Sequence, residues 1–275
     1  MLNFLYVILC GIALPVGGVQ MQYLWRNQLG DIYSLGLGSA ACLGAAAATM
    51  TGWCSLTAGA FICQGVCAVI VALVALRLDT PRLITFGILF GTLIGSIGTI
   101  VVTNAPTGDL LKQYYLWGAA NFKLQGVTGA DIAISLAMFA IGIASALLCA
   151  GKLTRHFKGE TELPDIAKAG ILLMVSILVT SVVSICGTIG FISLGIPNLA
   201  RITVPPGDIR KQYALSAGMG TVLLMITYLV VEYGNFGIYL PVSATMAILA
   251  LPLMAVIFRK TDSAAPDKSG QNPNA

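Results

Sequence analysis

Apolar residues are grouped along the chain into nine runs that are separated by shorter polar connections. An α-helix rises about 1.5 Å per residue, so roughly 20 apolar residues span the hydrocarbon layer of a bilayer. Seven runs reach that length, and we predict that the two short ones, at 37–51 and 192–202, are buried among other helices. The nine runs lie at 2–25, 37–51, 55–76, 83–103, 130–150, 166–187, 192–202, 212–232 and 238–258.

The composition of the chain requires lipid as its main solvent. The 275 residues are 57% hydrophobic and 9% charged, and the mean hydropathy is +0.89. Soluble domains contain about 25% charged residues. Helices satisfy their own backbone groups in lipid, and the runs lack the alternation typical of a membrane β-barrel. The predicted fold class is therefore all-α: a polytopic transmembrane helical protein with about nine membrane segments, two of them short.

Lysine and arginine are distributed unevenly between the connections. With an external N-terminus and nine crossings, only Lys112 and Lys123 of the 15 basic residues fall outside. Short cytoplasmic loops collect basic residues, so the asymmetry supports both this orientation and this number of crossings. We therefore expect a cytoplasmic C-terminus and no nucleic-acid partner. The cytoplasmic set is Arg26, Arg77, Arg82, Lys152, Arg155, Lys158, Lys168, Arg201, Arg210, Lys211, Arg259, Lys260 and Lys268.

Ionisable groups are missing from the middle of every predicted span. Asp131 begins one span, Glu232 ends another, and the other acids lie in connections. Ion-coupled carriers usually keep such groups within the membrane. The single histidine, His156, has no partnered nucleophile and is interpreted as a solvated loop residue. Because a P-loop motif is also missing, we expect no catalytic residue, metal or bound cofactor in this chain.

Small residues indicate close helix packing within the predicted bundle. Gly87, Gly91, Gly95 and Gly98 are spaced three or four apart in one span. Such a face lets helix backbones approach closely, and internal packing is favoured over a dimer interface. Most cysteines lie in apolar runs and are interpreted as small buried hydrophobes rather than metal ligands.

Several polar stretches follow one another in the order of a known set of motifs. Gln22, Arg26, Asn27 and Gly36 match the pattern Q-x-x-x-R-N-P-L-A-x-P-x-x-L-G, although Gln28, Gly30 and Ile32 replace its Pro, Ala and Pro. "RLITFGI" from Arg82 and "LWGA" from Leu116 are similar to two further motifs. "GTIGFISLGIPNLAR" at 187–201 is similar to G-P-I-G-F-V-G-L-x-x-P-H-x-x-R. The residues that match in this stretch and beyond it include Gly190, Phe191, Pro197, Arg201, Asp208, Arg210 and Pro241.

Together these stretches resemble the FecCD-type permease subunits of ABC importers for iron–siderophore complexes, haem and cobalamin. The resemblance implies the fold of the cobalamin-importer permease, in a bacterial cytoplasmic (inner) membrane. It also implies that two copies, or two paralogous chains, form the translocation pathway as a dimer. A separate ATPase subunit would use ATP, and an extracytoplasmic binding protein would deliver the chelate. The chain itself would be no enzyme.

In that family, the cytoplasmic loop after the sixth helix docks the ATPase. The corresponding connection here, at about 152–168, has a different sequence. By position and charge, the candidates for ATPase docking are Arg155, His156, Lys158, Glu160 and Glu162.

The altered docking loop and the missing first helix of the family leave an alternative open. The first motif follows the first predicted helix here and the second helix in the family, so the resemblance implies that the chain begins at the family's second helix. Asn198 replaces the family's histidine after Pro197. The alternative hypothesis is a stand-alone secondary carrier or a degenerate, non-transporting permease paralogue. In either case residues 1–260 form the permease domain, and the polar tail 261–275 is expected to be disordered in the cytoplasm.

Overall fold

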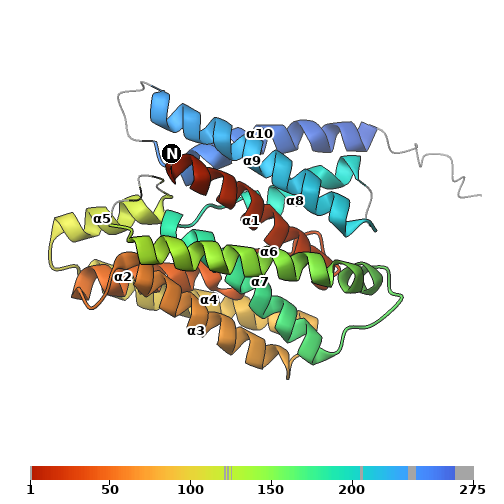
Figure 1. The fold of residues 1–275 in the computed structure, drawn as a ribbon, viewed down its shortest axis with the longest axis horizontal. Coiled ribbons are helices and arrows are strands. Elements are labelled where there is room, and N and C mark those ends of the chain that lie inside the picture. Colours follow the sequence, from red (N-terminus) through yellow and green to blue (C-terminus); the bar gives the residue numbers. More distant parts are fainter. Residues whose placement is uncertain are drawn as a thin grey trace, which may run out of the picture.

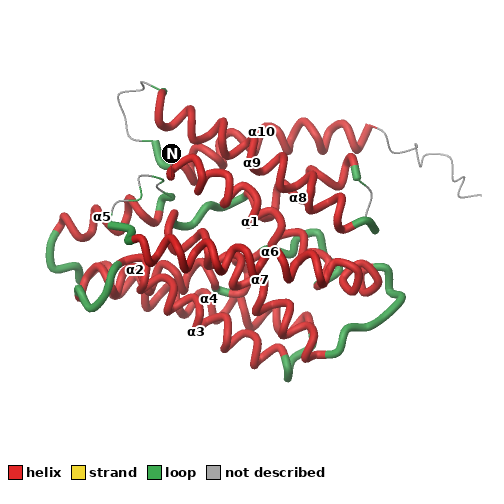
Figure 2. Tube along the Cα trace, viewed as in Figure 1, coloured by secondary structure: helices red, strands yellow, loops and turns green. Residues whose placement is uncertain are grey.

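The computed structural model is built of helices and connecting loops, without a strand among the residues that it describes (Figure 2). These residues are 2–120, 122, 124, 126–204, 207–234 and 240–263, with the backbone alone described from 253 onward. The elements are α1 (Leu2–Leu24), the 3₁₀ helix η1 (Ile32–Leu35), α2 (Leu37–Thr51), α3 (Leu56–Ala75), α4 (Thr80–Thr103), α5 (Gly108–Gly118), α6 (Gly129–Phe157), α7 (Asp165–Cys186), α8 (Ile192–Thr203), α9 (Ile209–Tyr233) and α10 (Val242–Ser263).

The nine predicted apolar runs each coincide with a described α-helix, and the predicted all-helical polytopic class is confirmed. Six helices are long and apolar enough to cross a membrane: α1, α3, α4, α6, α7 and α9. Helix α2 and the segment Val242–Pro252 of α10 are shorter apolar helices. The predicted number of nine crossings stays a prediction, because length and composition alone identify only these six.

Helix α1 lies at the centre of the bundle, between α8–α10 on one side and the remaining helices on the other (Figure 1). From Tyr6 to Leu24, only Ile8 and Ile12 are not buried. Its closest neighbour is α9, where a Cβ on Gly11 would overlap the backbone of Thr221 and one on Gly220 would overlap the carbonyl of Gly11. Small residues thus bring the two backbones together, and van der Waals packing at such crossings drives helix association in lipid.

The connections that the sequence assigns to the cytoplasm lie at one end of the bundle. The ends of α1 and α6, the α3–α4 turn and the start of α9 gather there, whereas α5 lies at the opposite end (Figure 1). Arg26, Arg77, Arg155 and Lys211 therefore share one end, and Lys112 on α5 lies at the other.

Two connections contain more helix than the sequence predicted. The segment 104–129 contains α5, whose start is capped by the Thr107 hydroxyl accepting from the amide of Leu110 (3.4 Å). This helix is amphipathic and short, so an apolar run did not reveal it. Helix α6 continues through Phe157, so Lys152, Arg155 and His156 are helical rather than part of a loop. Basic residues are favourable in a last helical turn, which explains why α6 extends past its apolar run.

The predicted permease domain and C-terminal tail stay predictions. Helix α10 is described as far as Ser263, three residues past the predicted end of the domain at 260. The rest of that predicted tail, 264–275, lies outside the described residues, as does part of the predicted start of the last run.

The glycine-rich face of α4 packs internally, as the sequence predicted. A Cβ on Gly87 would overlap the carbonyl of Ser34, and one on Gly91 would overlap the Cα of Gly36. Gly36 has φ of 80° at the start of α2, a backbone conformation that favours glycine. Helix α4 therefore presses directly on the turn from η1 into α2.

A second glycine contact fixes the crossing of α2 and α3 and can be tested. A Cβ on Gly59 would overlap the carbonyl of Gly44, whereas Gly65, on the same helix, has no neighbouring group within 4 Å. We expect Gly59→Val to destabilise the protein by about 1–3 kcal/mol or more through overpacking, and Gly65→Val to have a much smaller effect. Thermal unfolding in detergent measures the difference, and equal losses for both variants would contradict this packing.

Candidate functional site

Helix α1 ends in a Schellman motif that turns the chain back into the bundle. The amide of Arg26 donates to the carbonyl of Tyr23 (3.4 Å), and the amide of Asn27 donates to that of Gln22 (3.1 Å). Arg26 occupies the left-handed position of this motif, with φ of 50°, which glycine normally fills. The left-handed conformation costs a residue with a Cβ about 1–2 kcal/mol. Surrounding contacts must therefore hold Arg26 in place.

The side chain of Arg26 supplies these contacts and joins three segments. Its Nε donates to the carbonyl oxygen of His156 at 2.8 Å. Its Nη2 lies 3.3 Å from Nδ1 of His156 and 2.7 Å from Oε1 of Glu162. The end of α1, the end of α6 and the α6–α7 connection are thus held together by one guanidinium, whose planar fork suits several directed bonds.

His156 is a buried helix residue, and its interpretation as a solvated loop residue was wrong. Its side chain is 5% exposed, and Nε2 lies 3.1 Å from the carbonyl oxygen of Leu24. A carbonyl oxygen only accepts, so the contact with Leu24 is a hydrogen bond donated by Nε2, while Nδ1 faces Arg26 and Glu162. His156 therefore satisfies one of the carbonyls that the end of α1 leaves without a helical partner.

Glu162 is the exposed member of this cluster, with 71% of its side chain accessible. The hydrogen bond from Arg26 lowers the pKa of its carboxyl, although desolvation partly opposes the shift. Glu162 is therefore an anion at neutral pH. Of the other predicted docking residues, Arg155, Lys158 and Glu160 are exposed at the same end. Two of the five predicted docking residues, His156 and Glu162, thus contact Arg26. The other three are exposed to solvent.

Arg201 forms a second link at this end of the bundle. Its guanidinium lies over the rings of Tyr23 and Phe157, 5.7 Å from each centroid, in cation–π contact. The hydroxyl of Tyr23 accepts from the amide of Gly207 at 3.2 Å. Asp208 then caps α9, and its hydrogen bond with Lys211 lowers the pKa of its carboxyl. The Arg26 and Arg201 contacts together tie α1 to α6, α8 and the start of α9.

Two short helices, α2 and α8, begin inside the bundle at a common polar junction. The hydroxyl of Ser193, in the first turn of α8, donates to Oδ1 of Asp31 at 2.5 Å. Oδ2 of Asp31 accepts from the amide of Tyr33 (3.3 Å), whose hydroxyl donates to the carbonyl of Ile189 (3.3 Å). Nδ2 of Asn198 donates to the carbonyl of Gln28 at 3.1 Å. The stretch 20–36 therefore packs against the stretch 187–201.

The remaining positions singled out from the sequence support this junction or lie beyond it. Gln22 is fully buried, and its amide atoms have no hydrogen-bond partner within the described part of the chain. Gly190 and Phe191 (φ 72°) form the turn into α8, Pro197 lies inside α8, and Pro241 directly precedes α10. Arg210 is exposed at the first turn of α9.

Helix α4 carries a stripe of exposed hydroxyl groups that the sequence reading missed. The stripe consists of Thr85, Thr92, Ser96, Thr99 and Thr103, and it lies opposite the buried glycine face. Each hydroxyl donates to a carbonyl of the preceding helical turn, at 2.8–3.0 Å. The intervals of three, four and seven residues are the signal that predicts such a face. The stripe gives α4 one polar, uncharged strip on an exposed surface that is otherwise apolar, with side chains such as Leu89 and Ile100 beside it.

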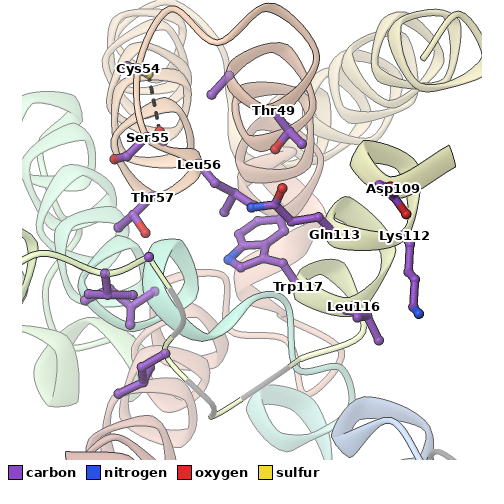
Figure 3. A pocket seen from close by; sticks show the side chains of 15 residues that line it. Thr49, Cys54, Ser55, Leu56, Thr57, Asp109, Lys112, Gln113, Leu116 and Trp117 are labelled. Atoms are coloured by element: carbon purple, nitrogen blue, oxygen red, sulfur yellow. Dashed lines mark hydrogen bonds between the residues drawn. The ribbon is translucent and has the colours of Figure 1, made fainter. Parts of the chain in front are cut away.

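A cavity of about 490 Å³ opens at the α5 end of the bundle, opposite to Arg26 (Figure 3). Its polar lining includes Thr49, Thr57, Gln113 and Trp117, and Asp109 and Lys112 stand at its α5 wall. Within the described residues, Nε1 of Trp117 and Oγ1 of Thr49 have no hydrogen-bond partner. The sequence reading did not find this cavity, because it depends on the placement of α5.

The arrangement of a central α1, two short helices and a polar cluster at one end of the bundle agrees with one family of membrane proteins. Residues 1–260 match the model of the FecCD transport family. The chain belongs to the FecCD transport family. The earlier resemblance is thereby confirmed, and the chain is an ABC importer permease of the FecCD/BtuC type.

Curated relatives cover most of the chain. The ABC transporter permease protein YvrB of Bacillus subtilis (strain 168) is 26% identical over 90% of this chain and 74% of its own length. The cobalamin import system permease protein BtuC of Halobacterium salinarum is 27% identical over 78% of this chain and 60% of its own length. The vitamin B12 import system permease protein BtuC of Salmonella newport is 27% identical over 94% of this chain and 81% of its own length.

Solved structures share the fold. An inward-facing metal-chelate type ABC transporter has a TM-score of 0.83 at 18% identity, over 94% of this chain and 85% of its own. PsaBC from Streptococcus pneumoniae has a TM-score of 0.61 at 14% identity, over 94% of this chain and 90% of its own. Family membership and fold support an integral inner-membrane protein, since the family consists of transport permeases.

The polar junction makes a prediction about stability. Asp31→Ala would leave the hydroxyl of Ser193 and the amide of Tyr33 without their acceptor inside the bundle. We expect a loss of about 1–3 kcal/mol in the free energy of unfolding. The control is Asp79→Ala, because Asp79 forms only an exposed pair with Arg82 (3.5 Å) and should change stability by less than about 0.5 kcal/mol. Thermal unfolding in detergent compares the two, and equal stability of both variants would refute the junction.

Proposed function

We propose that two copies of this chain, or this chain and a paralogue, enclose a translocation pathway for an iron–siderophore complex, haem or a related chelate. A separate ABC ATPase would drive the transport, and an extracytoplasmic binding protein would deliver the substrate. The observation that carries this proposal is the hydroxyl stripe of α4, on a helix whose other face is packed against η1 and α2.

The chemistry of the stripe suits the wall of a pathway for large, chemically varied chelates. Its hydroxyl protons are already donated within the helix, so the stripe remains stable when no substrate is present. The oxygen lone pairs still accept weak hydrogen bonds from water or substrate. A wall without charges neither traps an anionic chelate nor repels it. The same stripe from a second copy, placed opposite, would complete the pathway.

The cytoplasmic end supplies a surface for the ATPase. Arg155 and Lys158 are exposed on the last turn of α6 and at its C-cap, with Glu160 just beyond. Ile166, at the start of α7, is 80% exposed at the same end. Cations next to an exposed apolar side chain form a surface that is complementary to a partner with acidic residues around an apolar contact. The names of the relatives, which include vitamin B12 importers, support corrinoids as substrates equally well.

A stand-alone carrier is the second candidate, and one observation weighs against it. The ionisable groups of the described spans lie at helix ends, such as Asp131 in the capping box of α6 and Glu232 near the end of α9. A carrier that uses an ion gradient usually needs such groups within the membrane. A non-transporting paralogue is distinguished from an importer by the experiments that follow.

The pathway is tested by thiol labelling of α4. We expect Ser96→Cys to react with a water-soluble, membrane-impermeant thiol reagent at least about tenfold faster than Ile97→Cys. A step of one residue turns the side chain by about 100° away from the stripe and towards lipid. Labelling in proteoliposomes is compared with the unsubstituted chain, because the chain contains seven cysteines. Equal labelling at both positions, or none at Ser96→Cys, would reject α4 as the pathway wall.

The docking surface is tested by charge reversal. We expect Arg155→Glu combined with Lys158→Glu to weaken binding of a co-expressed ABC ATPase about tenfold or more, because like charges then face its acidic rim. Lys112→Glu reverses one charge at the opposite end and should leave binding unchanged. Co-purification and ATP-driven uptake of cobalamin, haem and ferric siderophores provide the measurements. Undiminished binding by the double variant would contradict docking at this end.

A further inference from the structure

The Arg26 cluster, defined as Arg26, His156, Glu162 and the carbonyl of Leu24, connects the proposed docking surface to α1, which is buried along most of its length. Arg155 and Lys158 flank His156 in the sequence and are exposed, while His156 itself points inward. A partner that pushes on Arg155 or Lys158 therefore moves the end of α6. The side chain of His156, at this same end, is hydrogen-bonded to α1.

The strain at Arg26 indicates that its side chain is retained for a purpose beyond ending the helix. Glycine at this position would form the same Schellman turn without strain. Arginine instead adopts φ of 50°, and its side chain makes bonds that only a planar, multidentate donor makes at one time.

The bonds of the cluster differ in strength in a way that predicts which residues matter. Glu162 is 71% exposed and Arg26 is 36% exposed, so their ion pair is screened by water. The bond from Arg26 to the carbonyl of His156 and the bond from His156 to Leu24 are shielded, because His156 is 5% exposed. Losing Arg26 should therefore weaken the connection much more than losing the carboxylate of Glu162.

Helix α1 is suited to receive a displacement at its end. It packs against α6, α7, α8 and α9, so its backbone touches both sides of the bundle. Its glycines abut α9 and, at Gly18, the carbonyl of Ser193 in α8. The turn that follows Arg26 leads directly to η1, on which the glycine face of α4 is packed, and the hydroxyl stripe lies on the other face of that helix.

We infer that Arg26 is a positioning residue that couples the ATPase-docking end of α6 to α1, and through η1 to the pathway face of α4. This inference rests on the proposed function. In this role the Arg26 cluster is a clamp, in which His156 and Glu162 bind Arg26 rather than the ATPase. The proposed ATPase contacts remain Arg155 and Lys158. When the docked ATPase moves the end of α6, the clamp carries α1 with it instead of letting the α6–α7 connection move alone.

A simpler role for Arg26 is that of a topology-setting cation at the cytoplasmic end. That role needs only a positive charge, so Arg26→Lys would preserve it. A clamp needs the guanidinium fork, which lysine lacks, so Arg26→Lys would fail. The two roles therefore predict opposite results for one conservative substitution.

The first measurement uses the chain alone in nanodiscs and needs no ATPase. Trypsin cleavage after Lys158, followed by mass spectrometry, reports how often the α6–α7 connection opens, since cleavage follows the population of the open state. We expect Arg26→Lys and Arg26→Gln to accelerate this cleavage by about tenfold, Glu162→Gln by about threefold or less, and the control Arg82→Gln, 79% exposed, not at all. A wild-type rate for Arg26→Lys overturns the clamp, and the lysine variant keeps the test valid if Arg26→Gln does not fold.

The second measurement tests coupling in the complex with the ATPase. Thiol labelling of Ser96→Cys is compared with and without ATP and vanadate, in chains that carry Arg26 or Arg26→Lys. We expect the nucleotide to change the labelling rate severalfold with Arg26 and by less than about twofold with Arg26→Lys, while ATP hydrolysis stays within about twofold. A merely structural role would reduce hydrolysis and the labelling response together, and an unchanged response in Arg26→Lys would also overturn the coupling.

The two measurements separate the inference from the function on which it rests. If no ATPase binds the wild-type chain, the proposed function and the coupling role both fail, whereas the trypsin rates still decide whether the clamp holds the connection. If the ATPase binds and Ser96→Cys responds to nucleotide regardless of Arg26, the proposed function stands and the inference fails.

Discussion

The burial of α1 is the constraint on which the rest of the structure depends. A helix in lipid gains little from hydrophobic burial, so its place at the centre must come from close packing and from polar contacts at its ends. Gly11 and Gly18 supply the close packing, because α9 and α8 approach them more closely than any side chain would allow. His156 and Arg26 supply the polar contacts, since His156 contacts the carbonyl of Leu24 at the end of α1 and Arg26 donates to the carbonyl of His156 at the end of α6.

Two interrupted segments of the fold lie beside α1. After α1 the chain re-enters the bundle through η1 and α2. The segment 187–191 enters on the other side and begins α8. Backbone that is not helical is tolerated at membrane depth only where protein surrounds it. Asp31, Tyr33 and Ser193 satisfy each other at this place, which explains why these polar residues occur together in an apolar chain.

Much of this could be predicted from the sequence, for reasons that particular residues make clear. The apolar runs gave nine helices at nearly their observed positions, because hydropathy has a strong signal over 20 residues. The motif around Arg26 and Asn27 led to the family. The role of His156 could not be predicted, because its burial depends on Leu24 and Arg26, which are about 130 positions away in the sequence. Helix α5 was missed because its signal is an amphipathic pattern and a threonine cap rather than an apolar run.

The placement of polar groups in the described chain argues for a division of labour between its two ends and its outer face. Charges are concentrated where α1 and α6 end, the exposed part of α4 carries a stripe of hydroxyls beside apolar side chains, and the α5 end has a partly polar cavity with few charges. Charges recognise a partner strongly but would hold a passing ligand too tightly, whereas hydroxyls accept weak bonds and release them. A strong contact at one end and a weak surface along α4 are what a permease needs when energy enters at the ATPase and substrate must leave. The guanidinium of Arg26 belongs to the first region, and the turn that follows Arg26 leads to η1, on which the inner face of α4 is packed.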